Sequence, residues 1–342
     1  MYSRVLCQRL DADLHVLLAR HQPVPLGFRP TVERLPFGRG LRWPVAPFVL
    51  PPPIAKCARR HDRTVLVSHA SLFTGPACVL AGRRTGLPVV VHAHHLETWG
   101  LARLVERWAL RRADRVVVDS QFVRRQVIAQ GVAQDRIMVV YCGVDPPVPV
   151  SPDAAQRALE GLGIWSGNQI VLSIGPVIAR KAPLEMVRAF AAVARSARRA
   201  KLVWLGAGPW RASALGLASD LGIGDRVVFP GHVPEIAKHA LLQEATVFVF
   251  GSRLEGFPLS VLEAMAAGLP VLAYRAASLP ELLGQAGVLA HSPTDFTHKL
   301  AELLRLPRWR QSVATDCLVR AGEFTWGRTV EGVRTAYSKD CT

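Results

Sequence analysis

The sequence predicts an α/β protein with two doubly wound domains facing a central cleft. Short, continuous apolar runs alternate with helical stretches along the chain, which is the pattern of parallel strands that helices bury on both faces. The runs form two series, separated by the turn-rich segment 143–166. A length of 342 residues accommodates two domains of ordinary size. Ligand is expected at the carboxyl ends of the strands.

Each run is apolar, rich in β-branched residues and bounded by turn residues, so each predicts one strand. The first series gives Leu14–Leu18, Thr64–Ser68, Pro88–His92, Arg115–Asp119 and Ile137–Tyr141. The second gives Gln169–Gly175, Lys201–Gly206, Arg226–Pro230, Thr246–Phe250, Pro270–Tyr274 and Gly287–Ala290.

The net charge of +16 is concentrated in the first part of the chain. Residues 1–150 hold 21 basic and 10 acidic residues, whereas residues 151–342 hold 21 and 16. A basic surface attracts polyanions, but no basic recognition helix or RNA-binding aromatic motif is present, so nucleic acid is not expected. The segment Arg34–Arg60 would either contact an anionic membrane surface or be solvated, and it contains Arg39, Arg42, Arg59, Arg60, Phe37, Trp43 and Phe48.

The six cysteines are scattered without a C-x-x-C pair, which favours a reducing compartment and disfavours a structural zinc site. The first residues lack the apolar stretch of a signal peptide, and no run of 18 apolar residues is present. We therefore expect a cytoplasmic protein, which is peripheral at the inner face of the membrane if its basic first domain contacts that surface and is not simply solvated.

The most informative segment is 252–270, S-R-L-E-G-F-P-L-S-V-L-E-A-M-A-A-G-L-P, which follows an apolar strand. It places Glu255 in a turn and Glu263 one turn inside a helix expected at Ser260–Ala267. A helix that begins after a strand presents backbone N–H groups and partial positive charge to a phosphate. The two carboxylates can accept hydrogen bonds from hydroxyl groups. Alternatively, Ser260 and Glu263 form only a capping box.

This segment resembles the E-x7-E signature of the retaining glycosyltransferases with a GT-B fold, which consists of two Rossmann-like domains. The resemblance implies an acceptor-binding domain at 1–148, a donor-binding domain at 149–322 and a helix at 323–342 that crosses back to the first domain. Further segments are similar to parts of that fold in the same order, namely Arg136–Asp145, Ile170–Phe190, Leu202–Pro209, Arg226–His232 and Phe324–Tyr337.

The resemblance implies a nucleotide-diphosphate sugar as co-substrate, and no cofactor is expected. No Asp-x-Asp motif or metal cluster stands out in the sequence, so a metal-independent mechanism is expected. Glu255 would accept a hydrogen bond from a hydroxyl of the sugar and Glu263 from the ribose, while Arg180 and Lys181 would neutralise the diphosphate. Outside such a site, two adjacent cations are often simply solvated. The other donor-binding positions are the backbone of Gly256, Phe257, Pro258, Leu259 and Ser260, together with Gly175 and the backbone near His232.

The cluster His92-Ala-His94-His95 ends an expected strand. Aligned on the preceding G-L-P-V-V-V, His94 matches the family's histidine that faces the donor sugar, and His95 replaces a common Asp. Three histidines also suit a metal, but no fourth ligand is close in sequence, so no metal is expected. His69 would either line the same cleft or be a satisfied core residue.

The chain departs from the family pattern at several positions. Pro176 stands where the family usually has an arginine, Ala182 replaces a glycine, and Cys142 replaces an asparagine. The family's first strand and Gly-rich loop are missing, because Met1–Leu10 is expected to form the helix that follows them; a start downstream of the natural one, or a truncated gene, would explain this.

We therefore expect a retaining glycosyltransferase whose acceptor is a lipid-linked or cell-envelope glycan. The alternative, which Pro176 and the missing loop favour, is a catalytically inactive GT-B-like scaffold that binds a nucleotide or a membrane.

Overall fold

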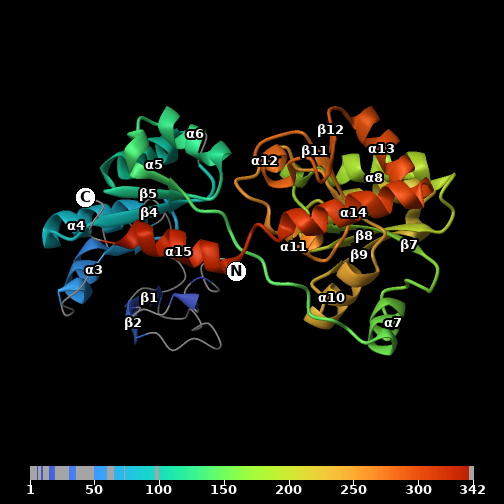
Figure 1. Cartoon of the computed structure of the whole chain (residues 1–342), viewed down its shortest axis with the longest axis horizontal. Helices are drawn as coiled ribbons and strands as arrows, with labels where there is room; N and C mark the ends of the chain where they lie inside the picture. Colours follow the sequence, from blue (N-terminus) through green and yellow to red (C-terminus); the bar gives the residue numbers. More distant parts are fainter. Residues whose placement is uncertain are drawn as a thin grey trace. The chain divides into compact units, whose positions relative to one another are not determined.

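The computed structural model describes residues 6, 9–10, 15–19, 31–35, 50–59, 65–72, 74–96 and 100–338. The chain forms two compact units (Figure 1). Unit 1 comprises Met1–Gly143 and Thr325–Thr342, and unit 2 comprises Val144–Phe324. Each unit contains a parallel sheet and helices, so the predicted α/β class with two domains is confirmed.

Unit 1 contains a four-stranded parallel sheet with the strand order β3-β4-β5-β6. Its strands are β3 (Leu66–Ser68), β4 (Val89–Ala93), β5 (Arg115–Val118) and β6 (Ile137–Val139). Its helices are α3 (Pro51–Ala58), α4 (Gly75–Thr85), α5 (Gly100–Arg112), α6 (Gln121–Ala129), the short 3-10 helix η1 (Gln134–Arg136) and α15 (Trp326–Tyr337). Strands β4 and β5 consist mainly of valine. Every second valine, namely Val89, Val91, Val116 and Val118, lies in one buried hydrophobic core.

The first expected strand is present as β1 (His15–Ala19), but the expectation that it belongs to the main sheet was wrong. It pairs in parallel with β2 (Thr31–Leu35) in a separate two-stranded sheet. Strand β2 was not predicted, because Glu33 and Arg34 interrupt its apolar pattern. Of the helix expected at Met1–Leu10, only three residues are described, and there Leu10 N–H donates to the Leu6 carbonyl at 3.0 Å.

Helix α15 packs on unit 1 although it lies at the end of the chain. Arg115 of β5 donates to the Thr335 carbonyl at 3.0 Å, and Thr329 Oγ1 donates to the Tyr141 carbonyl at 2.9 Å. The approach at the helix start is so close that a Cβ added to Gly143 would lie 2.5 Å from the Trp326 nitrogen.

Unit 2 contains a six-stranded parallel sheet with the order β12-β11-β10-β7-β8-β9. Its strands are β7 (Gln169–Ile174), β8 (Ala200–Leu205), β9 (Val227–Gly231), β10 (Val247–Phe250), β11 (Val271–Tyr274) and β12 (Val288–Ala290). Its helices are α7 (Pro152–Glu160), η2 (Ala179–Lys181), α8 (Pro183–Ala194), α9 (Arg211–Asp220), η3 (Gly224–Arg226), α10 (Glu235–Glu244), α11 (Leu259–Ala266), α12 (Leu279–Leu283), α13 (Pro293–Arg305) and α14 (Pro307–Ala321).

The strand order of unit 2 reverses between β7 and β10. From β7 the chain adds β8 and β9 on one side, and it then returns to place β10, β11 and β12 on the other. Helices α8 and α13 cover one face of this sheet and α10 lies at the other (Figure 1). Because the loops after β7 and β10 leave the sheet in opposite directions, a crevice forms between them at the carboxyl edge in such folds.

Candidate active site

The loops after β7 and β10 bring the adjacent cations Arg180 and Lys181 to Glu255, which lies 75 residues after Arg180 in the sequence. Lys181 Nζ lies 2.7 Å from Glu255 Oε1, and Arg180 Nη1 donates to the same oxygen. Arg180 also donates to the Leu254 carbonyl at 2.7 Å. Two cations thus face one carboxylate, which leaves an excess of positive charge at this edge of the sheet.

Burial decides how strongly these charges interact. The side chains of Lys181 and Glu255 are 10% and 12% exposed, whereas that of Arg180 is 36% exposed. Burial lowers the pKa of the Lys181 ammonium, and Glu255 opposes that shift. Burial alone would raise the pKa of the Glu255 carboxyl, but the hydrogen bond from Arg180 and the charge of Lys181 outweigh it and hold the pKa below its ordinary value. Glu255 is therefore an anion at neutral pH.

Glycines let the loops at this edge approach one another. Gly175, just after β7, has φ +147°, and Trp204 Nε1 donates to its carbonyl at 2.9 Å. A Cβ on Gly206, which has φ +138°, would lie 2.1 Å from the Gly175 carbonyl oxygen. A Cβ on Gly251 would lie 2.8 Å from the Lys181 carbonyl oxygen. The loop that carries Arg180 and Lys181 is thus held tightly by its neighbours.

The second carboxylate of the motif, Glu263, lies in α11 and makes a different ion pair. Its Oε2 is 3.0 Å from Lys238 Nζ of α10, with both side chains about a fifth exposed, at 23% and 17%. Helix α11 begins at Leu259 after Pro258, and no side chain caps it. The capping-box alternative for Ser260 and Glu263 is therefore excluded.

The remaining predicted donor-binding residues surround the start of α11 or lie at the same edge. Gly256 and Pro258 are buried, and the Phe257 ring packs 5.7 Å from that of Phe324, so its side chain is a packing group. Ser278 donates to the Glu255 carbonyl at 3.0 Å and holds the turn. His232, directly after β9, is exposed.

Ala182, which replaces the glycine of the family pattern, adopts the left-handed conformation with φ 53° and ψ 48°. This conformation costs a non-glycine residue about 1 kcal/mol or more. We expect Ala182→Gly to be neutral or to stabilise unit 2 by about 0.5 kcal/mol. Glycine removes the backbone strain of the folded state, but it also makes the unfolded chain more flexible, and this offsets part of the gain in stability. Urea unfolding measures this.

The matched control is Ala192→Gly, in the exposed part of α8, which should lose about 1 kcal/mol because glycine weakens a helix interior. Equal losses at both positions would contradict the left-handed backbone at Ala182.

In unit 1, the predicted His94 belongs to a cluster of three imidazoles at the carboxyl edge of the sheet. His69 follows β3, His92 is the fourth residue of β4, and His94 follows β4 directly. The ring centroids of His69 and His92 are 4.4 Å apart, and those of His92 and His94 are 5.9 Å apart. Burial, and next the charge of His94, lower the pKa of His69 to about 4. Burial likewise lowers the pKa of His92.

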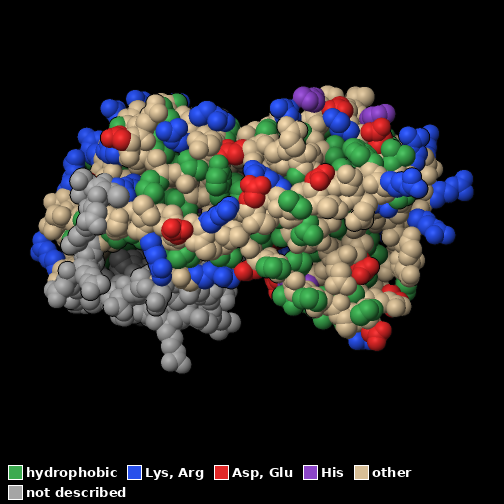
Figure 2. Space-filling view, viewed as in Figure 1, with side chains coloured by type: hydrophobic (Ala, Val, Ile, Leu, Met, Phe, Trp, Pro, Cys, Tyr) green, Lys and Arg blue, Asp and Glu red, His purple; other side chains and the backbone are tan. Residues whose placement is uncertain are grey.

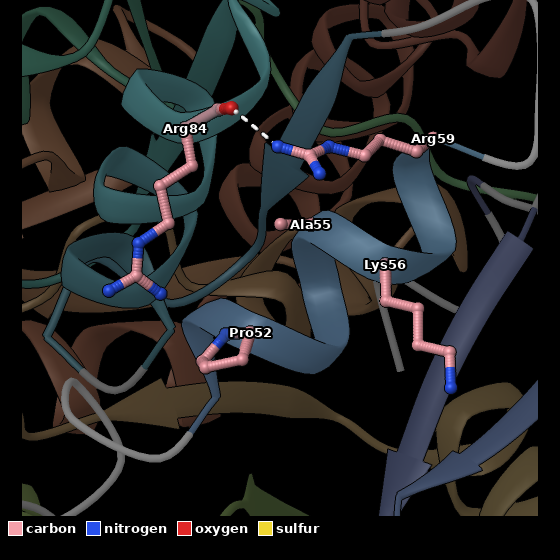
Figure 3. Close-up of a pocket in the computed structure, with 5 residues that line it drawn as sticks. All are labelled: Pro52, Ala55, Lys56, Arg59 and Arg84. Atoms are coloured by element: carbon pink, nitrogen blue, oxygen red, sulfur yellow. Dashed lines mark hydrogen bonds between the residues drawn. The ribbon is translucent and has the colours of Figure 1, made fainter.

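The expected membrane-contact segment lies mostly outside the described residues, but Arg59 is described. It lines a cavity of about 500 Å³ with Pro52, Ala55, Lys56 and Arg84, and its Nη2 donates to the Arg84 carbonyl at 3.0 Å (Figure 3). Lys56 points away from Arg84 in that view, so the cations do not converge. Figure 2 likewise shows Lys and Arg side chains at several separate places on unit 1.

Within the described part of the chain, no helix is both long and apolar enough to cross a bilayer.

Two contacts were not predicted from the sequence. Lys238 pairs with Glu263, and Tyr337 OH lies 2.8 Å from His92 Nε2. Each joins residues from different elements. Lys238 belongs to no segment that the sequence singled out, and Tyr337 ends a segment that was matched to the family fold without a contact for its side chain.

Models of two families match almost the whole chain. The model described as glycosyl transferases group 1 matches residues 156–315, and the model described as Glycosyltransferase Family 4 matches residues 3–147. The D-inositol 3-phosphate glycosyltransferase of Nocardiopsis dassonvillei is 31% identical over 327 residues, which cover 87% of this chain and 75% of the relative. The 2-deoxystreptamine glucosyltransferase of Streptomyces kanamyceticus is 30% identical over 231 residues, or 63% and 59% of the two chains.

The chain spans 55–75% of the length of five D-inositol 3-phosphate glycosyltransferases that it matches. Among solved structures, Anabaena Alr3699/HepE in complex with UDP and glucose superimposes with a TM-score of 0.78 and 19% identity, over 90% of this chain and 85% of that one. At this identity the likeness shows the fold alone.

Proposed function

This chain belongs to the group 1 glycosyltransferases, and from that membership we propose that unit 2 binds a nucleotide-diphosphate sugar through the loops after β7 and β10. The observation that carries the proposal is the meeting of Arg180, Lys181 and Glu255 at the point where the strand order reverses. Ligands of open α/β sheets bind at such a point. The HepE structures contain UDP, UDP with glucose, or UDP-glucose, which supports a UDP-sugar as the first donor to test.

The charges suit a reaction in which a diphosphate leaves. Negative charge accumulates on the departing phosphate, and fixed cations stabilise it most where water is largely excluded. Lys181 is buried and Arg180 is partly exposed, and their charge exceeds that of Glu255. The uncapped start of α11 adds backbone N–H groups and the positive end of the helix dipole. Pro176 is exposed after β7 and supplies no charge, so Arg180 takes over the role of the missing arginine.

Glu255 would orient a hydroxyl of the donor sugar. The reaction proceeds with retention and without a metal. The acceptor is a compound that carries a hydroxyl group. It belongs to one of two classes: a lipid-linked or cell-envelope glycan, or a small cyclitol. The names of the two relatives, which act on an inositol phosphate and on 2-deoxystreptamine, favour the cyclitol.

The test is release of nucleoside diphosphate from UDP-, GDP- and ADP-glucose, alone and with each acceptor class. One donor should release its nucleotide slowly without an acceptor and much faster with the right acceptor. Activity should be retained in the presence of a chelator, and NMR should detect the α-anomer of the product. Binding of the donor should also raise the unfolding temperature of the protein. Donor binding without any turnover would instead support the inactive scaffold, and the absence of binding to every donor would refute the site.

A second test isolates Glu263, which we propose accepts hydrogen bonds from the ribose. Glu263→Ala should weaken UDP binding by about 10- to 100-fold, because a hydrogen bond to a charged group contributes about 1.5–3 kcal/mol. The same variant should bind 2′,3′-dideoxy-UDP no more weakly than the unaltered chain does. Calorimetric titration measures both.

Lys238→Met is the matched control, since it removes the partner of Glu263 but keeps the carboxylate. It should lose less affinity than Glu263→Ala. An equal loss for UDP and its dideoxy analogue in Glu263→Ala would show that Glu263 does not bind the ribose.

A further inference from the structure

The three histidines of unit 1 have the arrangement of a metal site. They come from two adjacent strand ends, and one ring nitrogen of each lies within 4.8 Å of those of the other two. We propose that His69, His92 and His94 bind a single divalent transition-metal ion, with Zn²⁺ as the best match. The sequence places only His92, His94 and His95 together, whereas the fold supplies His69 from the end of β3.

The hydrogen bonds around the cluster divide the ring nitrogens into two sets. His92 Nε2 lies 2.8 Å from Tyr337 OH, and His94 Nδ1 lies 3.1 Å from Asp119 Oδ2. Metal-binding histidines characteristically use one nitrogen for the ion and the other for a carboxylate or similar partner, which fixes the tautomer and the ring orientation. The nitrogen that His92 offers to an ion is then Nδ1, which has no hydrogen bond among the described residues.

Two nitrogens of the cluster lack a partner in the described part of the chain. His69 Nδ1 and His92 Nδ1 are both buried without a hydrogen bond there, and the His92 residue is 0% exposed. A buried polar atom left without a partner costs about 1–3 kcal/mol, and such atoms call for an explanation. Both ring nitrogens of a histidine in a protein core normally have hydrogen-bond partners. Two ring nitrogens without a partner in one cluster therefore favour a ligand that both of them bind. One cation would satisfy both.

The ligand atoms indicate which kind of metal ion the cluster would bind. Three imidazole nitrogens suit Zn²⁺ and neighbouring transition metals, whereas Mg²⁺ and Ca²⁺ prefer oxygen ligands. Three protein ligands leave the fourth tetrahedral position to water. The Asp119 carboxylate behind His94 partly compensates the charge of the ion.

The ion can reach the cluster, since the His94 side chain is 33% exposed. Nitrogens about 2.1 Å from a tetrahedral zinc lie roughly 3.4 Å apart, whereas those of the cluster lie within 4.8 Å of one another, so the nitrogens must approach by up to about 1.4 Å on binding. Rotation of the partly exposed His94 ring provides such a movement.

The test uses the full chain, stripped with a chelator and titrated with Co²⁺ and then Zn²⁺. We expect one Co²⁺ per chain, visible absorption bands typical of tetrahedral cobalt with nitrogen ligands, and displacement by an equimolar amount of Zn²⁺. His69→Ala and His94→Ala should each weaken binding at least tenfold. His298→Ala, whose side chain is 71% exposed in unit 2, should bind as the unaltered chain does.

Absence of stoichiometric binding would overturn the proposal, and so would unchanged affinity in His69→Ala. A strong thiolate-to-cobalt band would assign the ion to a cysteine and would overturn it as well. Circular dichroism of each variant shows whether it has folded, and two independent histidine variants keep the test decisive. Since metal binding is measured directly, the result does not depend on whether the chain transfers a sugar.

Discussion

Replacement of Glu255 by glutamine is expected to reduce kcat/KM for sugar transfer by about 100-fold or more, the effect of removing one preorganised polar contact to the reacting group. Glutamine keeps the shape of the side chain but removes its charge. Arg180 and Lys181 would then face each other without the carboxylate that both contact. Nucleotide release and transfer to the acceptor measure the effect.

The same substitution should also destabilise unit 2, by about 2 kcal/mol. Removal of one partner from a fully buried ion pair costs about 3–5 kcal/mol, and the partial exposure of this pair reduces that cost. Glu235→Gln is the control, because the Glu235 side chain is 73% exposed and should change little.

The double variant Glu255→Gln with Lys181→Met separates stability from activity. It removes both charges of the buried pair, so urea unfolding should recover most of the lost stability. Activity should stay low, since both proposed donor contacts are gone. Full activity in Glu255→Gln alone would show that this carboxylate does not orient the sugar.

Gly206→Ala is expected to lose about 4 kcal/mol of stability, among the largest effects of a single substitution. The added Cβ would lie 2.1 Å from the Gly175 carbonyl oxygen, which belongs to the backbone and cannot rotate away. The φ of +138° adds strain for any residue with a side chain. Urea unfolding of unit 2 measures the loss.

Two further glycine-to-alanine variants, at Gly175 and Gly216, provide controls with smaller expected effects on stability. Gly175→Ala has φ strain, but its Cβ approaches only the end of the Lys181 side chain, with Cε at 3.7 Å and Nζ at 4.0 Å. A loss of about 1–2 kcal/mol is therefore expected, and the variant should fold. Gly216→Ala in α9 meets nothing within 4 Å and should gain about 0.5–1 kcal/mol. Equal stability of all three variants would contradict the close packing of the loops after β7 and β8.

Local patterns predicted most of the fold. The six apolar runs expected in the second series correspond to β7–β12 within a few residues, because strands buried on both faces need continuous apolar sequence. Strand β2 was missed because its charged residues conceal that pattern. The partner of β1 also could not be predicted, since pairing depends on which strand the fold brings alongside.

The sequence by itself determined which residues carry the candidate chemistry. Arg180, Lys181, Glu255 and Glu263 were chosen because two short segments resemble motifs of the glycosyltransferase family, and such a motif is a local pattern of residues. Only the tertiary structure decided which of them meet. The reversal of strand order brings Glu255 to Arg180, 75 residues away, whereas Glu263 pairs with Lys238. Likewise, parallel strands end at the same edge, so His69 joins His92 and His94. Contacts between elements depend on strand order, which a local pattern does not contain.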